Sequence, residues 1–190
     1  MIPVLLLLVS VILFRIAPSF GGPEAVRSMA GWSPLMALAL CGAAFFPRRW
    51  ALAIGLAAVV VPHFIINSVQ GYPMWDAYLP TLAFSVLAVS ALGASVGKKA
   101  PVAVFAGASL FSTVLFHLVS NTVSFFMEPA YAPTLAGWLQ CQTTGLPGYP
   151  PTWLFSLKQL AGDLLFTVSF VTLVRRPLFT VSPSTVPVQA

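Results

Sequence analysis

The chain has 190 residues, of which 58% are hydrophobic and only 7% are charged. Soluble domains carry about 25% charged residues, so the composition excludes an ordinary soluble domain and indicates an integral membrane protein. The formal net charge of +5 does not indicate a nucleic-acid-binding protein, because the basic residues lie at the ends of apolar segments and not on one polar face.

Six apolar segments follow one another along the chain, separated by prolines, glycines or charged residues. They lie at residues 2–17, 31–46, 50–67, 78–96, 101–126 and 153–174. Their lengths are near the roughly 20 residues that a helix needs to cross a bilayer. We therefore expect an all-α, polytopic membrane domain of six transmembrane helices over residues 1–176, with the first helix retained and not cleaved as a signal peptide. Residues 177–190 are rich in Pro, Ser and Thr and are expected to form a disordered cytoplasmic tail.

Three basic pairs predict the orientation of these helices. They lie at 48–49, 98–99 and 175–176, each on the same side of the predicted bundle. Because positively charged loops stay in the cytoplasm, this side is expected to be cytoplasmic, with both chain termini on it. The outer loops are then 18–30, 68–77 and 127–152. Cys41 and Cys141 fall at opposite depths and are not expected to pair, and Cys141 is expected to be exposed in the last outer loop.

Polar side chains recur at every fourth residue in the outer halves of three predicted helices. Residues four apart share a helix face, and the three polar faces lie at similar depth. They predict a cavity that opens to the outside and has Asp163 as its floor. The candidate binding residues are Arg15, His63, Asn67, His117, Asn121, Lys158, Gln159 and Asp163. Arg15, Arg27 and Lys158 could meet an anionic group of a ligand, or the first two could bind lipid phosphates.

Each of these residues also has a structural interpretation. Asn and Thr in membrane helices often only hold neighbouring helices together, and Lys158 could extend to the headgroups. Asp163 could pair with Lys158 or Arg15, but a carboxylate near the midplane cannot reach water, which favours a function. His63 and His117 on facing helices could instead ligate a haem iron. No spacing of metal ligands and no catalytic motif is present in the sequence.

Several runs of residues are similar to those of a family of uncharacterised bacterial membrane proteins. They are Phe14-Arg15-Ile16-Ala17-Pro18, the helix from Trp32 to Phe46, His117-Leu-Val-Ser-Asn121, Tyr131 with Gly137-Trp-Leu-Gln-Cys141, and Gly162-Asp163-Leu-Leu-Phe166. The resemblance covers most of residues 14–174.

That family resembles the substrate-binding S-components of energy-coupling-factor (ECF) transporters. The resemblance implies a six-helix protein of the bacterial cytoplasmic membrane that binds a vitamin or similar micronutrient from outside. It also implies partners supplied in trans, namely a transmembrane coupling subunit and ATPase subunits. Many S-components dock through an Ala-x-x-x-Ala pattern in the first helix. Residues 2–17 lack this pattern, so small-residue faces in 31–46 or 50–67 are the candidate replacements.

The sequence thus leads to three hypotheses. The first is a non-enzymatic, S-component-like subunit for micronutrient uptake, without cofactor or nucleic-acid partner. The second is a small membrane haem or redox protein that uses His63 and His117. The third is a structural membrane protein whose polar residues only join helices.

Overall fold

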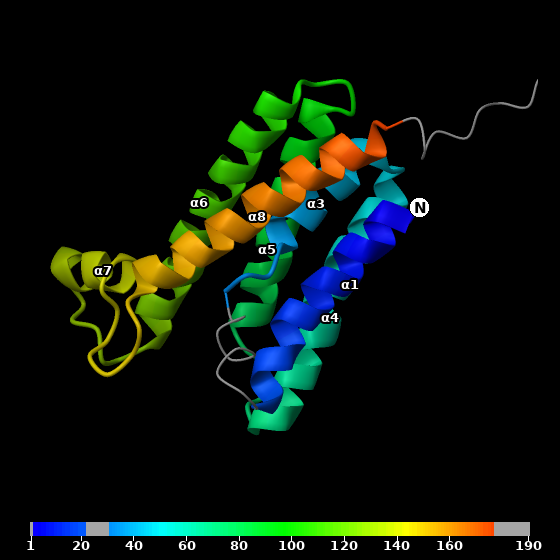
Figure 1. The fold of residues 1–190 in the computed structure, drawn as a ribbon. Coiled ribbons are helices and arrows are strands. Elements are labelled where there is room, and N and C mark those ends of the chain that lie inside the picture. Colours follow the sequence, from blue (N-terminus) through cyan, green and yellow to red (C-terminus); the bar gives the residue numbers. More distant parts are fainter. Residues whose placement is uncertain (1, 22–30, 177–190) are drawn as a thin grey trace, which may run out of the picture.

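The structure, a computed structural model, describes residues 2–21 and 31–176, and in the first helix the side chains from Leu6 onward. These residues form helices and no strand (Figure 1). The elements are α1 (Ile2–Ile16), the 3-10 turn η1 (Ala17–Phe20), α3 (Leu35–Phe45), α4 (Arg48–Gln70), α5 (Tyr78–Val96), α6 (Val102–Met127), α7 (Leu135–Gln142) and α8 (Thr152–Val174). The all-helical class is confirmed. The expected tail 177–190 and residues 22–30 of the first outer loop lie outside the described residues.

Within the described residues, four helices are long and apolar enough to cross a membrane. They are α4, α5, α6 and α8, with 23, 19, 26 and 23 residues. The other two predicted spans are shorter, because α1 has 15 residues and α3 has 11. The predicted segment 31–46 begins too early: Pro34 stands at the N-cap of α3, and a residue that precedes proline is disfavoured in the helical conformation. The predicted segment 50–67 is too short, since α4 continues to Gln70 and ends at Gly71 with φ 71°.

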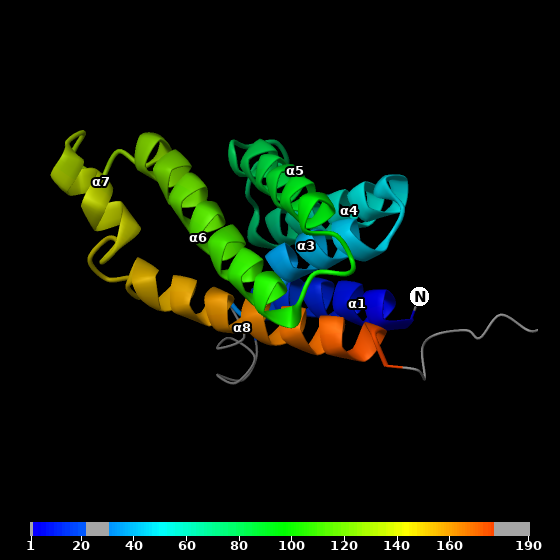
Figure 2. The ribbon, with the colours of Figure 1, turned by 90° about the horizontal axis from the view of Figure 1, so that it is seen from above.

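Helix α3 is the centre of the bundle (Figure 2). It packs against α1, α4, α5, α6 and α8. Every residue from Leu35 to Gly42 is buried, so this part of the helix has no face left for lipid. A helix that is apolar all round is buried on all sides, whether by lipid or by protein, and here the protein covers it.

Glycines permit this close packing. A Cβ atom at Gly93 of α5 would overlap the carbonyl oxygen of Leu40 in α3. A Cβ atom at Gly162 of α8 would lie 2.8 Å from the carbonyl oxygen of Trp32, just before α3. Small residues at helix contacts let the backbones approach closely, as is common in membrane proteins.

The three basic pairs lie at one end of the bundle, as the sequence predicts. The guanidinium of Arg175 donates to the carbonyl oxygen of Lys98 over 2.9 Å and lies 5.9 Å from the ring centroid of Phe45. The α3–α4 connection, the α5–α6 connection and the end of α8 are therefore neighbours. In Figure 1 the start of α1 lies at this same end, while η1, α7 and the α4–α5 connection lie at the other.

The region 127–152 is not only a loop, which corrects the prediction from sequence. It contains α7, whose first turn is capped by Thr134: the hydroxyl accepts from the N–H of Gly137 over 3.2 Å. Cys141 lies in this helix and is only 1% exposed; its thiol donates to the carbonyl oxygen of Asn121 over 3.2 Å. The expected exposure of Cys141 is therefore wrong. An eight-residue helix is too short to show a clear helical period, so the sequence did not reveal it.

Candidate ligand-binding site

A cavity of about 960 Å³ opens at the end of the bundle opposite the basic pairs. Its wall comes from the end of α1 with η1, the segment before α3, the second half of α4, the α4–α5 connection, the start of α5, the second half of α6 and the first turns of α8. Sites for small molecules have volumes of about 300–1,000 Å³ and mostly apolar walls with a few placed polar groups. This cavity has that size and that composition.

Six of the eight predicted binding residues line this cavity. They are Arg15, His63, Asn67, His117, Asn121 and Gln159. Lys158 and Asp163 are not part of the wall. Consecutive helical residues point about 100° apart, so Lys158 does not share the face of Gln159. The polar faces of α4, α6 and α8 thus line one cavity. Lys158 does not belong to its wall, and Asp163 does not form its floor.

His63 and Asn67 form one polar cluster with the α4–α5 connection. The side-chain amide of Asn67 donates to the carbonyl oxygen of Pro73 over 2.6 Å and to Asp76 Oδ2 over 3.2 Å. Both N–H groups of this amide are then used. His63 Nε2 therefore donates to the carbonyl oxygen of Met74 over 3.3 Å, and it lies 3.7 Å from Asp76 Oδ1.

Asp76 is a cavity residue that the analysis of the sequence missed. Its Oδ1 accepts from the N–H groups of Tyr78 over 2.9 Å and Leu79 over 3.1 Å, so it caps the start of α5. Asp76 lies two residues before Tyr78, the first residue of α5. Aspartate at the start of a helix is a typical N-terminal signal, and this signal could have revealed it. Asp76 fixes the α4–α5 connection to α5 while Asn67 fixes the same connection to α4.

His117 forms a second polar cluster, which joins three helices. Its Nε2 lies 3.0 Å from the carbonyl oxygen of Gln142 in α7 and must carry the proton. Its Nδ1 then accepts from the side-chain amide of Asn121 over 2.9 Å and from the hydroxyl of Ser156 in α8. Ser156 was missed, although it lies three residues before Gln159 and so on the same face of α8.

Helix α7 is held on α6 by further contacts of this kind. Thr122 Oγ1 accepts from the indole N–H of Trp138 over 3.0 Å and from the amide of Gln142 over 3.2 Å. Burial raises the pKa of the nearby Cys141 thiol above its ordinary value. A thiol with a raised pKa is mostly protonated at neutral pH and reacts slowly. The cysteine is thus part of the α6–α7 contact.

Asp163 performs a structural task beside the cavity. It is completely buried. Its Oδ1 accepts from the N–H of Ala37 over 3.0 Å, and its Oδ2 accepts from the hydroxyl of Thr113 over 2.9 Å. The first N–H groups of a helix have no partner within the helix, and Pro34 at the N-cap of α3 gives no side-chain cap. Asp163 of α8 supplies that cap from another helix. Its carboxyl group also lies at the positive end of the α3 dipole, where negative charge is stabilising.

Arg15 enters the cavity wall from the last turn of α1. Its Nε is buried and has no hydrogen-bond partner within the described part of the chain. Residues 2–21 and 31–176 contain no group of three His, Cys, Asp or Glu side chains that could hold a metal ion.

Fold and site together define a class: a helical membrane protein with a polar and aromatic cavity at one end of its bundle. The chain belongs to the family of unknown function DUF6580, whose model matches residues 1–178. No curated protein and no solved structure matches the chain.

Proposed function

We propose that this protein is the substrate-binding membrane subunit of an ECF-type importer for a micronutrient such as a vitamin. One observation carries the proposal: a cavity of ligand size, lined by polar side chains of α1, α4, α6 and α8, lies at the end of the bundle away from the basic pairs. By the positive-inside rule the basic end is cytoplasmic. The cavity then opens outward, where an S-component receives its substrate.

The polar side chains of the cavity wall are held in place by hydrogen bonds, which also supports a binding function. His63 and Asn67 are fixed by the α4–α5 connection, and His117 is fixed by α7 and α8. Polar groups that are held in place before the ligand arrives lose little conformational entropy on binding. Such a site suits a scarce nutrient that must be bound tightly.

We propose six transmembrane segments, although α3 is short. Its 11 residues span only about 16 Å of a hydrocarbon core about 30 Å thick. Gly31 and Ser33, which precede it, line the cavity. Non-helical backbone at membrane depth is tolerated where it lines a cavity or lies within protein, so residues 31–34 can complete the crossing.

For docking on a coupling subunit, α4 offers the better surface. Ala37, Ala39 and Gly42 of α3 are buried within the bundle and cannot meet a partner. Ala53 and Ala57 of α4 are both exposed and lie one turn apart on one face. We expect the double variant A53L/A57L to lose co-purification with ATPase subunits from native membranes and to keep its ligand. Unchanged co-purification would exclude this surface.

Native mass spectrometry of protein purified gently from rich medium tests the proposed function. We expect one small-molecule adduct per protein, lost in N67A, where the α4 cluster is broken. K158Q is the matched control, because Lys158 lies on α8 outside the cavity wall, and it should keep the adduct. If no adduct is found, even after a vitamin mixture is added back, the proposal is wrong.

An absorption spectrum of the same sample tests the haem alternative. An axial ligand must offer a free nitrogen lone pair to the iron. In the described residues Nε2 of His117 faces the carbonyl of Gln142, and its Nδ1 faces Asn121 and Ser156. No contact of His117 in the described residues favours haem binding, and a Soret band would instead support the haem hypothesis.

A further inference from the structure

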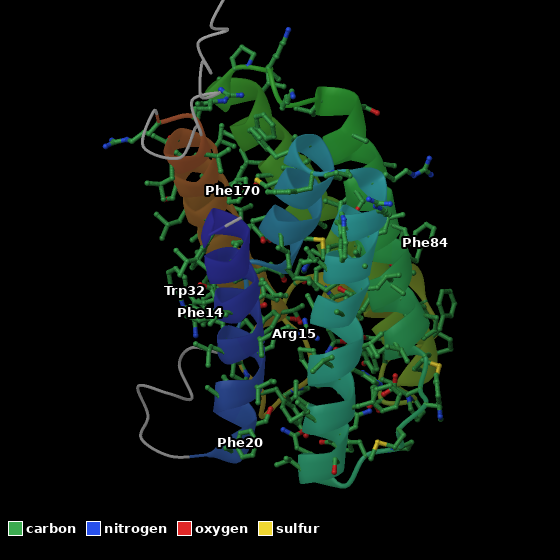
Figure 3. The ribbon with its side chains drawn as sticks, turned by 90° about the vertical axis from the view of Figure 1, so that its right-hand side faces the viewer. Phe14, Arg15, Phe20, Trp32, Phe84 and Phe170 are labelled. Atoms are coloured by element: carbon green, nitrogen blue, oxygen red, sulfur yellow. The ribbon has the colours of Figure 1, made fainter. Side chains whose placement is uncertain are left out.

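Arg15 stands out among the cavity residues because of its charge. The guanidinium group is always protonated in proteins. In the cavity wall, as far as the structure describes it, the carboxyl group is that of Asp76. Figure 3 shows Arg15 between α1 and α4, on the inner side of α1. Its Nε is buried without a partner in residues 2–21 and 31–176. A buried cation is costly unless an anion or several acceptors compensate it.

The carboxylates of the described residues are committed elsewhere. Asp76 accepts from Asn67 and from the start of α5. Asp163 accepts from Ala37 and Thr113, and Glu128 accepts from the N–H of Ala130 over 3.2 Å. None of the three lies within 4.0 Å of Arg15, since the described ion pairs comprise only His63 with Asp76. The fourth acidic residue, Glu24, lies outside the described residues. Within residues 2–21 and 31–176, Arg15 thus has no carboxylate partner, and its side chain lines the cavity wall.

A second polar group in the same wall is also unsatisfied. The hydroxyl of Ser33 is buried and has no partner in the described part of the chain. A buried hydroxyl or N–H without a partner destabilises the structure, and a ligand that accepts hydrogen bonds removes that cost. Aromatic rings of Phe116 and Phe155 line the cavity as well. They can cover an apolar or ring-shaped body.

We infer that the ligand is a small, water-soluble organic anion, with its carboxylate or phosphate on Arg15 and Ser33 and its apolar body against Phe116 and Phe155. This inference rests on the proposed function. Arginine binds both carboxylates and phosphates through paired N–H groups. A phospholipid headgroup offers the same chemistry, so the experiment must separate the two sources.

The probe is the dialysable fraction of yeast extract, passed over an anion exchanger. The anions retained by the column and the flow-through are added separately to the purified full-length protein, delipidated in detergent. Thermal unfolding and native mass spectrometry are then measured. We expect the retained fraction to raise Tm and to give an adduct, and the flow-through to do neither.

Two arginine variants locate the contact. R15M should bind the retained fraction roughly tenfold more weakly or worse, as for the loss of a charge-assisted bidentate contact. R49M is the matched control, because Arg49 is exposed at the opposite end of the bundle, and it should bind as the wild type does. If R15M does not fold, R15K replaces it: it keeps the charge but loses the fork geometry, and weaker binding is expected.

The outcomes separate the inference from the proposed function. Stabilisation by the flow-through would mean a neutral or cationic ligand, which overturns the inference and leaves the proposed function standing. A phospholipid as the adduct, or equal binding by R15M and the wild type, also overturns it. If neither fraction raises Tm or gives an adduct, both the inference and the proposed function are wrong.

Discussion

At the scale of single residues, buried polar groups in this protein divide into those that hold helices together and those that face the cavity. Asp163 belongs to the first group, because its oxygens meet the N–H of Ala37 and the hydroxyl of Thr113. Arg15 belongs to the second. Spacing along the sequence cannot make this distinction, since both residues are ionisable groups within apolar segments.

We predict that D163A destabilises the protein and leaves the cavity residues unchanged. The buried N–H of Ala37 would lose its acceptor, so the free energy of unfolding should fall by about 2 kcal/mol or more. Thermal unfolding in detergent measures this, and T113V, which removes one of the two bonds, should show a smaller loss. A variant with unchanged Tm that no longer binds ligand would restore Asp163 as a binding residue.

The thiol of Cys141 gives a prediction for the dependence on pH. Because burial raises its pKa, the reactive thiolate is the minor form at neutral pH. Alkylation by iodoacetamide should be slow at pH 7 and rise about tenfold per pH unit below the pKa. The C41A variant isolates the signal of Cys141. Rapid alkylation at pH 7 in the folded protein would show that the thiol is neither buried nor protonated.

At the scale of elements, α3 explains why a helix too short to span a bilayer lies within a membrane bundle. Five other helices surround it, and α5 approaches it where Gly93 has no side chain. The close contact between the two backbones makes the position of this glycine sensitive to any added volume.

We expect G93A to destabilise the protein by about 1–3 kcal/mol, the usual range for overpacking a core, because its methyl group would meet the carbonyl of Leu40. G107A in α6 is the control: apart from the neighbouring residues and backbone of its own helix, no atom lies within 4 Å of its added Cβ, and alanine is the better helix former. G107A should leave Tm unchanged or raise it. Equal effects of the two substitutions would contradict the packing of α3 against α5.

The sequence predicted where the long helices lie, but it did not predict which helices and residues contact one another. Long apolar runs predict α4, α5, α6 and α8 within a few residues, because length and hydropathy are local properties. The burial of α3 could not be predicted, since lipid and protein favour the same apolar composition. His63 and His117, which lie in the four-residue repeats of α4 and α6, line one cavity. The contact between Ala37 and Asp163 depends on helix packing, which no local pattern specifies.

At the scale of the whole molecule, the ends of the bundle differ in charge and in shape. One end carries the three basic pairs, and the other carries the cavity and α7. The positive-inside rule predicts the orientation in the membrane, and this prediction is open to a direct test.

Single cysteines placed at the two ends of α6 provide that test. In a C41A/C141A background, E128C follows the last residue of α6 and K99C precedes its first turn, and both positions are exposed. We expect a membrane-impermeant maleimide to label E128C on intact spheroplasts and to label K99C only after the membrane is opened. The reverse pattern would place the cavity in the cytoplasm and exclude uptake from outside.

Helix α3 also connects the two ends of the molecule. Ser33 and Leu35 at its start form part of the cavity wall. Phe45 at its end stacks on Phe105, and the guanidinium of Arg175 lies near its ring. Close-packed interiors transmit displacement because they have little free volume. A ligand that moved the start of α3 would therefore also shift Phe45 at its other end, about 16 Å away, next to the basic pairs. A partner bound at that end could then respond to an occupied cavity without touching the ligand.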